Sequence, residues 1–552
     1  MIGEGIQYVS MDEFYADVLV IGGGLAGVVA AISAAMAGKD VAILSRGRIG
    51  RSGNTVVSGS AMAVYRGDNP YQDSISDFRQ DVLSSGKGLS DRGMADRFVR
   101  ESEPVFDLLE SYGVKFRYVE GNRLIKQPPG HSHRRSYPTD FRTCPYLNRG
   151  LAFGLPLREK ALETGVRFCE GCDALSLDAV EGQICGVYAL DVHSQKLFYF
   201  HSAAVILSCG GGASIYWNTN NTSDVTCDSY RLASEAGAVL RDMEFVQFYP
   251  TMMFEPARVV ISNPLFGDGA VVRNRYGERF LSRYTPMGDR ATRDNMSRAI
   301  QLEIQAGGGN PDYVYVDCSM IDPRTLDMKY AELSEQLRRH GLDIHSDLIP
   351  VAPTAHFYLG GICVNESCAT SVSGLYACGE AVGGLHGANR LSGNALTEAA
   401  VSGRIAGEGA AKDLPSLNIR RVLHTLAMPK GRNDEDAGAL IQRLRKVMWQ
   451  KASIVKTEAS LSDASAEIDM IERKSRDCVV RSAADLRRFY QLRSYLSTAR
   501  MLLICSKQRK ESRGAFYRED YPNTNAQWAG SFFCSIQNGE LLTKFVYNDR
   551  KE

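Results

Sequence analysis

Three glycines near the N-terminus are the first residues whose spacing points to a chemical task. Gly22, Gly24 and Gly27 form a G-x-G-x-x-G run between an apolar stretch and a run rich in alanine and valine. Such glycines permit a tight turn, let the backbone approach a pyrophosphate and allow a helix to pack closely on a strand. Amide groups at the start of that helix would face the phosphates. Residues 17–44 therefore predict strand, glycine turn, helix and strand, arranged to bind a dinucleotide.

The residues after the second strand argue against a plain NAD site. NAD-binding folds place an acidic residue there, whereas this chain has Ser45 and Arg46. The apolar stretch 18–38 is also long enough to cross a membrane. Three consecutive glycines at 22–24 interrupt it where a tight turn belongs, so we expect no direct membrane span.

Composition excludes several classes of protein. The chain has 552 residues, with 64 basic and 64 acidic side chains and a formal net charge of zero. This balance gives no support to a nucleic-acid-binding or polybasic membrane protein. Thirteen scattered cysteines, an odd number, indicate a reducing, cytoplasmic compartment rather than a disulfide scaffold. Cys169 and Cys172 form a lone C-x-x-C pair, so we predict no metal site.

Two further glycine-rich strand ends indicate a nucleotide domain assembled from distant parts of the chain. The apolar run at 203–213 contains three glycines at its end, and residues 374–404 again predict strand, glycine turn and helix. Residues 439–473 and 486–510 instead show helical periodicity, many charges and few glycines. We therefore expect a nucleotide-binding domain from 1–240 and 350–412, an insertion at 241–349, and a helical domain at 413–552.

Eight ordered blocks carry a family resemblance that runs nearly end to end. They are GGGLAG at 22–27, FVQFYPT at 245–251, GERF at 277–280, RDNMSRAI at 293–300, HFYLGGI at 356–362, LYACGEA at 375–381, HGANRLSGNAL at 386–396 and ESRGAFYREDYP at 511–522. Together they resemble the flavoprotein subunits of succinate dehydrogenase and fumarate reductase, and L-aspartate oxidase. The resemblance implies an α/β, Rossmann-like FAD-binding domain of the glutathione-reductase type, an inserted α+β capping domain and a C-terminal helical domain. The active site would lie between the first two.

The same resemblance implies FAD as the cofactor. Dehydrogenase members attach the flavin to a histidine in an Arg-Ser-His-Thr segment, whereas this chain reads RSGNT at 51–55, with Asn54 in place of that histidine. An amide is not a competent nucleophile, so we predict non-covalent FAD, and members without the covalent bond tend to act as reductases or oxidases. The implied cofactor-binding residues are Gly22, Gly24 and Gly27 at the pyrophosphate, Ser45, Asn54, Asp228 near the flavin, Glu380 at the adenosine ribose, and Ser392, Asn394, Ala395 and Leu396 at the pyrophosphate and flavin.

Reduction of a C=C bond beside a carboxylate needs a hydride, a proton and positive charge at the carboxylate. The hydride would come from flavin N5, and the resemblance makes Arg293 the proton donor. An arginine is a poor acid in water, because its pKa exceeds about 12, so a relay would have to return its proton. Arg390 and His356 match the pair that grips one substrate carboxylate, for which a guanidinium offers a fork of donors.

Four positions depart from the family pattern. This chain has Tyr249 in place of a histidine, and Ser262 and Asn263 in place of Thr-Glu. In the family, the His and Thr hold the second carboxylate of fumarate. Its Glu and an Arg together carry protons to the catalytic arginine, and this chain has Phe266 in place of that second Arg. Tyr249 and Ser262 keep hydroxyl groups in the substrate site. We therefore expect an unsaturated acid with one carboxylate and an aromatic, neutral polar or thioester-like far end; fumarate with a rebuilt relay is the alternative.

Other readings concern the reaction and the electron donor. The segment GHSHRR at 130–135 resembles part of L-aspartate oxidase, although an exposed basic loop would look the same. A third alternative is an electron-transfer flavoprotein subunit of an iron–sulfur complex whose substrate site has decayed. The presence of Arg293, His356 and Arg390 argues against this loss of the substrate site. Electrons must come from outside, and the resemblance implies an iron–sulfur subunit. The basic tail at 481–513 is a candidate docking face, and any membrane association would run through partner subunits.

Overall fold

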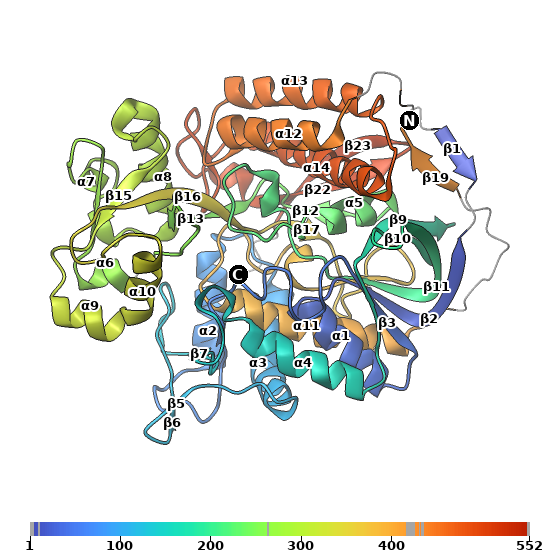
Figure 1. The fold of residues 1–552 in the computed structure, drawn as a ribbon, viewed down its shortest axis with the longest axis horizontal. Helices are drawn as coiled ribbons and strands as arrows, with labels where there is room; N and C mark the ends of the chain where they lie inside the picture. The colour runs from blue at the N-terminus through green and yellow to red at the C-terminus, as the bar shows by residue number, and fades with distance from the viewer. Residues whose placement is uncertain are drawn as a thin grey trace.

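A seven-stranded sheet forms the centre of the computed structural model, which describes residues 5–8, 11–261, 264–415, 425–429, 431 and 435–548 (Figure 1). Its order is β8 (Arg167–Glu170), β3 (Val41–Ser45), β2 (Asp12–Ile21), β11 (Lys196–Leu207), β10 (Gln183–Asp191) and β9 (Cys172–Val180), and β18 (Leu375–Ala377) pairs with β11. The pairs among β8, β3, β2, β11 and β18 are parallel, and β10 and β9 extend the sheet in antiparallel fashion.

Helices cover both faces of this sheet. The apolar cores of β2 and β3 are buried throughout, as expected for parallel strands covered on both sides. One face packs against α1 (Leu25–Met36), α4 (Leu151–Glu163) and α11 (Asn394–Lys412), and α11 also contacts α3 (Arg92–Ser111). The other face meets α5 (Asp228–Glu235) and α14 (Ala483–Gln508). Residues 18–38 are thus the end of β2, a turn and α1.

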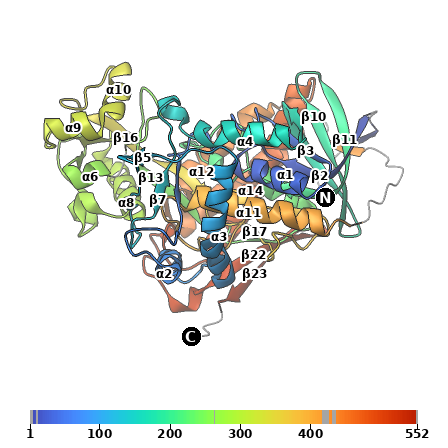
Figure 2. The same cartoon turned by 90° about the horizontal axis from the view of Figure 1, so that it is seen from below.

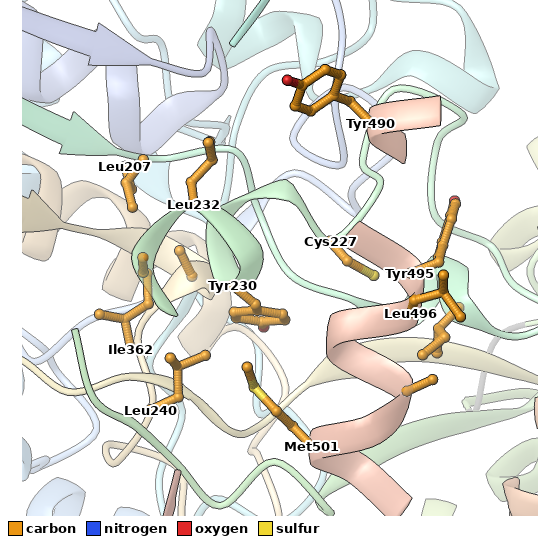
Figure 3. Close-up of a cluster of buried hydrophobic side chains, with 14 of the residues drawn as sticks. Leu207, Cys227, Tyr230, Leu232, Leu240, Ile362, Tyr490, Tyr495, Leu496 and Met501 are labelled. Carbon is orange, nitrogen blue, oxygen red and sulfur yellow. The ribbon is translucent and has the colours of Figure 1, made fainter. Parts of the chain in front are cut away.

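The C-terminal part is mainly helical. α12 (Ala437–Ala452), α13 (Glu458–Ser475) and α14 pack on one another, with α13 outermost in Figure 1. Figure 3 shows side chains of α14, among them Tyr495, Leu496 and Met501, near Tyr230 of α5. The helical prediction misses a hairpin, β22 (Gly530–Gln537) and β23 (Glu540–Tyr547), which joins β12 (Leu240–Arg241) and β17 (Gly361–Ile362) in a four-stranded sheet. This hairpin ties the C-terminal part to the nucleotide domain.

The inserted segment has a hydrophobic core of its own, formed by residues between 253 and 351. Its sheet has the order β13 (Val246–Met253), β16 (Ile349–Tyr358), β15 (Val314–Asp317) and β14 (Val271–Arg273). Its helices are α6 (Pro264–Asp268), α7 (Leu281–Tyr284), α8 (Arg293–Glu303), α9 (Pro323–Lys329) and α10 (Ala331–Arg339). Figures 1 and 2 both place these helices at one end of the molecule. We call this part the cap.

Short elements complete the fold: α2 (Ile75–Ser85) and the strand pairs β1 (Gly5–Tyr8) with β19 (Thr425–Met428), β20 (Val455–Lys456) with β21 (Tyr517–Arg518), β4 (Ala61–Ala63) with β7 (Ser136–Pro138), and β5 (Tyr118–Val119) with β6 (Asn122–Arg123). Among the helices of the described ranges, none is both long enough and apolar enough to cross a bilayer.

Candidate active site

The glycine turn between β2 and α1 is too tight for side chains. A Cβ on Gly22, whose φ is +117°, would lie 2.4 Å from the carbonyl oxygen of Ser208, and one on Gly27 would lie 2.0 Å from that of Gly22. Gly24 caps α1 without a side-chain hydrogen bond, and the first turn of α1 carries no acidic residue. The turn therefore presents backbone rather than side chains, as a pyrophosphate requires.

A second helix start contributes to the same region. Asn394 is the first residue of α11, and its buried Oδ1 has no hydrogen-bond partner in the described structure. Ala395 and Leu396 follow it. Ser392 lies just before the turn at Gly393, and its carbonyl oxygen accepts a hydrogen bond from His131 Nε2 at 2.9 Å. A buried amide oxygen without a partner is costly, and a bound cofactor would supply one, so these residues fit a nucleotide cofactor.

Glu380 and Asn54 form a polar network between the sheet and the cap. Glu380 accepts hydrogen bonds from Tyr358 N at 2.9 Å and from Asn54 Nδ2 at 3.4 Å, and burial raises the pKa of its carboxyl to about 7. Asn54 also donates to Asn221 Oδ1 at 2.9 Å and accepts from Thr222 N at 3.1 Å. The side chain at the family's attachment position is thus held by protein amide groups, and it offers no nucleophile.

Asp228 lies beside the end of β3. Its Oδ2 pairs with Arg46 NH2 at 3.0 Å, and its Oδ1 accepts from Ser494 Oγ at 2.6 Å. Arg46 also pairs with Asp173, and Ser45, the last residue of β3, is buried. In dinucleotide folds the end of this strand lies near the adenosine ribose. The structure therefore holds Asp228 in an ion pair with Arg46, and its place near the flavin stays a prediction.

Catalytic candidates from four segments of the chain converge at the cap. Arg293, the first residue of α8, has its Cζ 4.9 Å from the ring centroid of Tyr249 on β13. The ring of Tyr249 lies 5.7 Å from that of His356 on β16. Arg390 belongs to the loop before α11, and its Cζ lies 4.4 Å from the ring of Phe357. Strands β13 and β16 are hydrogen-bonded neighbours, which brings these side chains together.

The two arginines lack the anionic partners that buried guanidinium groups usually have. Within the described residues, neither Arg293 nor Arg390 forms a salt bridge, and each has a buried Nε without a hydrogen-bond partner. Arg390 NH1 donates to the carbonyl oxygen of Leu391 at 3.1 Å. Burial and the charge of Arg293 lower the pKa of Arg390 to about 10. Two like charges with open donors make this a site that an anion would stabilise.

His356 is neutral in this field. Burial, followed by the charges of Arg390 and Arg293, holds the pKa of its imidazole well below the usual 6.5. Its Nδ1 lies 3.0 Å from Asn220 Nδ2 and 3.2 Å from Asn220 Oδ1, while Nε2 has no protein partner in the described part of the chain. When Asn220 Nδ2 donates to Nδ1, the ring proton sits on Nε2, where it can be donated to a carboxylate.

Asn220 should therefore be a positioning residue. We expect Asn220→Ala to lower kcat/KM about 10- to 100-fold. In Asn220→Asp the carboxylate would accept from Nδ1–H, leaving Nε2 without a proton, and would raise the pKa of His356. Activity of that variant should rise as the pH falls through the raised pKa, because protonation restores Nε2–H, whereas the wild type needs no such protonation. Parallel pH profiles of kcat/KM for both proteins would contradict this role.

The departures from the family pattern are partly visible. Tyr249 is buried, and its hydroxyl donates to the carbonyl oxygen of Ile261 at 3.3 Å. Phe266 is buried in the core of the cap. Ser262 and Asn263 lie outside the described residues. Sequence reasoning missed Asn220, and the only signal was a polar run at 218–222 after a glycine-rich strand end.

The exposed-loop reading of the GHSHRR segment is wrong for its buried members. Arg135 is fully buried and pairs with Asp73 and Asp81, each at 2.6 Å. His131 is buried too, and burial and Arg135 lower the pKa of its imidazole to about 4. Because His131 holds the carbonyl of Ser392, the segment supports the loop that carries Arg390.

The basic tail also differs from its sequence-based interpretation. Arg487 pairs with Asp173, Arg493 with Glu235 and Arg500 with Glu472. Arg509 is fully buried between Glu244 and Glu511, and Arg513 pairs with Glu511. These internal ion pairs neutralise much of the segment, so 481–513 is not a free positive docking face.

Comparisons with known proteins agree with this architecture. A family model described as an FAD binding domain matches residues 17–396, and one described as fumarate reductase flavoprotein C-term matches 441–546. An uncharacterized FAD-dependent oxidoreductase of Methanocaldococcus jannaschii is 34% identical over 527 residues, covering 93% of this chain and 95% of that protein. A fumarate reductase (CoM/CoB) chain of Methanothermobacter marburgensis is 33% identical over 547 residues, covering 96% of this chain and 98% of that protein.

Two further proteins bear on the reaction. L-aspartate oxidase of Acinetobacter baylyi is 31% identical over 530 residues, covering 93% of this chain and 94% of that protein. The structure of E. coli quinol fumarate reductase FrdA matches with a TM-score of 0.88 and 25% identity, covering 97% of each chain.

The glycine turn, the layered sheet and the matched domain define an FAD-dependent oxidoreductase, and FAD is its cofactor. The chain belongs to the family of succinate dehydrogenase and fumarate reductase flavoproteins, which also contains L-aspartate oxidase.

Proposed function

We propose that this protein reduces the C=C bond of an α,β-unsaturated carboxylate. The observation that carries the proposal is the pair of guanidinium groups, Arg293 and Arg390, which converge near neutral His356 without carboxylate partners in the described structure. A substrate carboxylate would complete this arrangement. Positive charge at the carboxylate also stabilises the enolate that develops during reduction.

The residues divide the work as follows. Arg390 and His356 would hold one carboxylate, with the guanidinium fork on its oxygens and Nε2–H as a further donor. Arg293 would deliver a proton to the α carbon. FAD, when bound, supplies the hydride that the β carbon receives. Tyr249 would border the far end of the substrate through its ring and hydroxyl group.

Tyr249 favours a substrate with a single carboxylate. A phenol cannot carry the positive charge that a histidine provides for a second carboxylate. The guanidinium of Arg293 already lies over the Tyr249 ring. Phe266 packs among apolar side chains of the cap and has no group that could relay a proton. We infer that the substrate is an enoate whose far end is aromatic or neutral and polar. We also infer that the protein binds FAD non-covalently.

An L-aspartate oxidase-like reaction is the second candidate, favoured by the relatives with that name and by the GHSHRR segment. The Ser392 and Asp73 contacts give that segment a supporting role near Arg390, which either reaction could use. The electron donor is proposed to be an iron–sulfur subunit, because structural neighbours come from fumarate reductase and succinate dehydrogenase complexes.

Flavin reoxidation tests the proposal. The holoenzyme is reduced without oxygen and mixed with fumarate, crotonate, cinnamate, urocanate or iminoaspartate, while the flavin absorbance is followed. We expect fast reoxidation by a monocarboxylate and little by fumarate. Reoxidation by fumarate alone would show that the substrate is fumarate and not a monocarboxylate. Rapid reoxidation by air, with every acid inert, would overturn the proposal in favour of the oxidase.

A further inference from the structure

A cleft of about 300 Å³ opens beside the catalytic cluster, where three parts of the chain meet. The nucleotide domain contributes Lys87 and Asn389, and the first two turns of α8 contribute Asp294 and Arg298. The C-terminal part contributes the segment around Phe516. The proposed catalytic residues Arg293, His356 and Arg390 do not line it, so it is a separate space.

Chain neighbours connect the cleft to the catalytic arginines. Asp294 lines it and directly follows Arg293, and Asn389 lines it and directly precedes Arg390. Gln247 joins the two sides, because its Nε2 donates to Asn389 Oδ1 and to the carbonyl oxygen of Arg390, each at 2.9 Å. The cleft and the catalytic cluster thus share the backbone that positions both guanidinium groups.

The charges of the lining favour a small anion. Lys87 is exposed and forms no ion pair with the described residues. Among the described residues, Arg298 donates only to Asn295 Oδ1, and its Cζ lies 4.6 Å from the ring centroid of Tyr517. Arg513 is neutralised by Glu511. The lining therefore has two cations that are not neutralised, Lys87 and Arg298, and one carboxylate, Asp294.

We infer that this cleft is an encounter site, in which an organic monocarboxylate is held before it reaches Arg293 and Arg390. The inference rests on the proposed function and extends it to the route of the substrate. A volume of about 300 Å³ lies at the lower end for small-molecule sites and suits a short acid. Asp294 would repel a second carboxylate, so the cleft has the same preference for one charge as the catalytic cluster.

The first test replaces Lys87. Lys87→Gln should raise KM and lower kcat/KM for the best monocarboxylate about 3- to 10-fold at low ionic strength, because a charge that attracts the substrate is lost. The difference from wild type should shrink at high salt, which screens exposed charges. Lys196→Gln is the control: it removes an exposed charge, paired with Asp12 at 3.7 Å, at the start of β11, at the opposite end of the molecule from α8. Equal kinetics in both variants would overturn the inference.

The second test separates the cleft from the catalytic cluster. Saturation-transfer NMR would measure crotonate binding to Arg390→Gln holoenzyme, in which the main carboxylate clamp is removed. We expect weak binding that disappears on adding Lys87→Gln or Arg298→Gln. Absence of binding in Arg390→Gln, or binding unaffected by the second substitution, would overturn the encounter site. If binding follows this pattern while no enoate reoxidises the wild-type flavin, the proposed reaction fails and the carboxylate site stands.

Discussion

Arg390→Gln is expected to reduce kcat/KM by at least about 10²- to 10³-fold, the scale seen when one preorganised donor to a developing anion is removed. Glutamine is shorter and has neither the charge nor the guanidinium fork, so it cannot hold a carboxylate in the same way. Arg390 is buried, and within the described residues it forms no ion pair. Flavin reoxidation kinetics with the best substrate of the panel would measure the effect.

Three further readouts distinguish substrate binding from a structural role for Arg390. The flavin-to-protein ratio should stay at the wild-type value. The free energy of unfolding, measured without substrate, should not fall, because removing an unpaired buried cation also removes its desolvation cost and its repulsion with Arg293. The pKa of His356 should rise, since one of the two charges that depress it is gone. Normal kinetics in this variant would refute the substrate model.

Gly27→Ala should yield protein that binds FAD poorly. The added Cβ would lie 2.0 Å from the carbonyl oxygen of Gly22 and 2.4 Å from Ser208 Oγ, so the turn would have to open. Overpacking by a methyl group costs about 1–3 kcal/mol, which corresponds to about a 10- to 100-fold loss of affinity if it falls on the turn that holds the pyrophosphate. Titration of the apoprotein with FAD would measure this loss.

Gly59→Ala provides the matched control, because a Cβ there meets nothing within 4 Å and the backbone is not left-handed. It should bind FAD like the wild type. Thermal unfolding of both variants without FAD would show whether Gly27→Ala also destabilises the apoprotein. Wild-type FAD affinity in Gly27→Ala would show that the turn does not need glycine at this position.

The sequence alone determined the class of protein. A glycine spacing, an apolar strand and a helix are local features, and local sterics are enough to predict the β2–turn–α1 unit. Asn54 in place of a histidine and Tyr249 in place of another are likewise readable from single positions within ordered blocks. Both chemical consequences, non-covalent FAD and a changed second clamp, follow from the side chain alone and stay predictions.

The tertiary structure decided what each charge does. Arg293, His356 and Arg390 are far apart in the chain, and only the pairing of β13 with β16 and the placement of α8 bring them together. The pKa values of His356 and Arg390 depend on burial and on neighbouring charges, which no sequence pattern encodes. The basic tail shows the converse, because Arg509 meets buried Glu244 from a distant segment. Composition counts charges, whereas packing determines which are neutralised and which, like those of Arg293 and Arg390, remain available to a substrate.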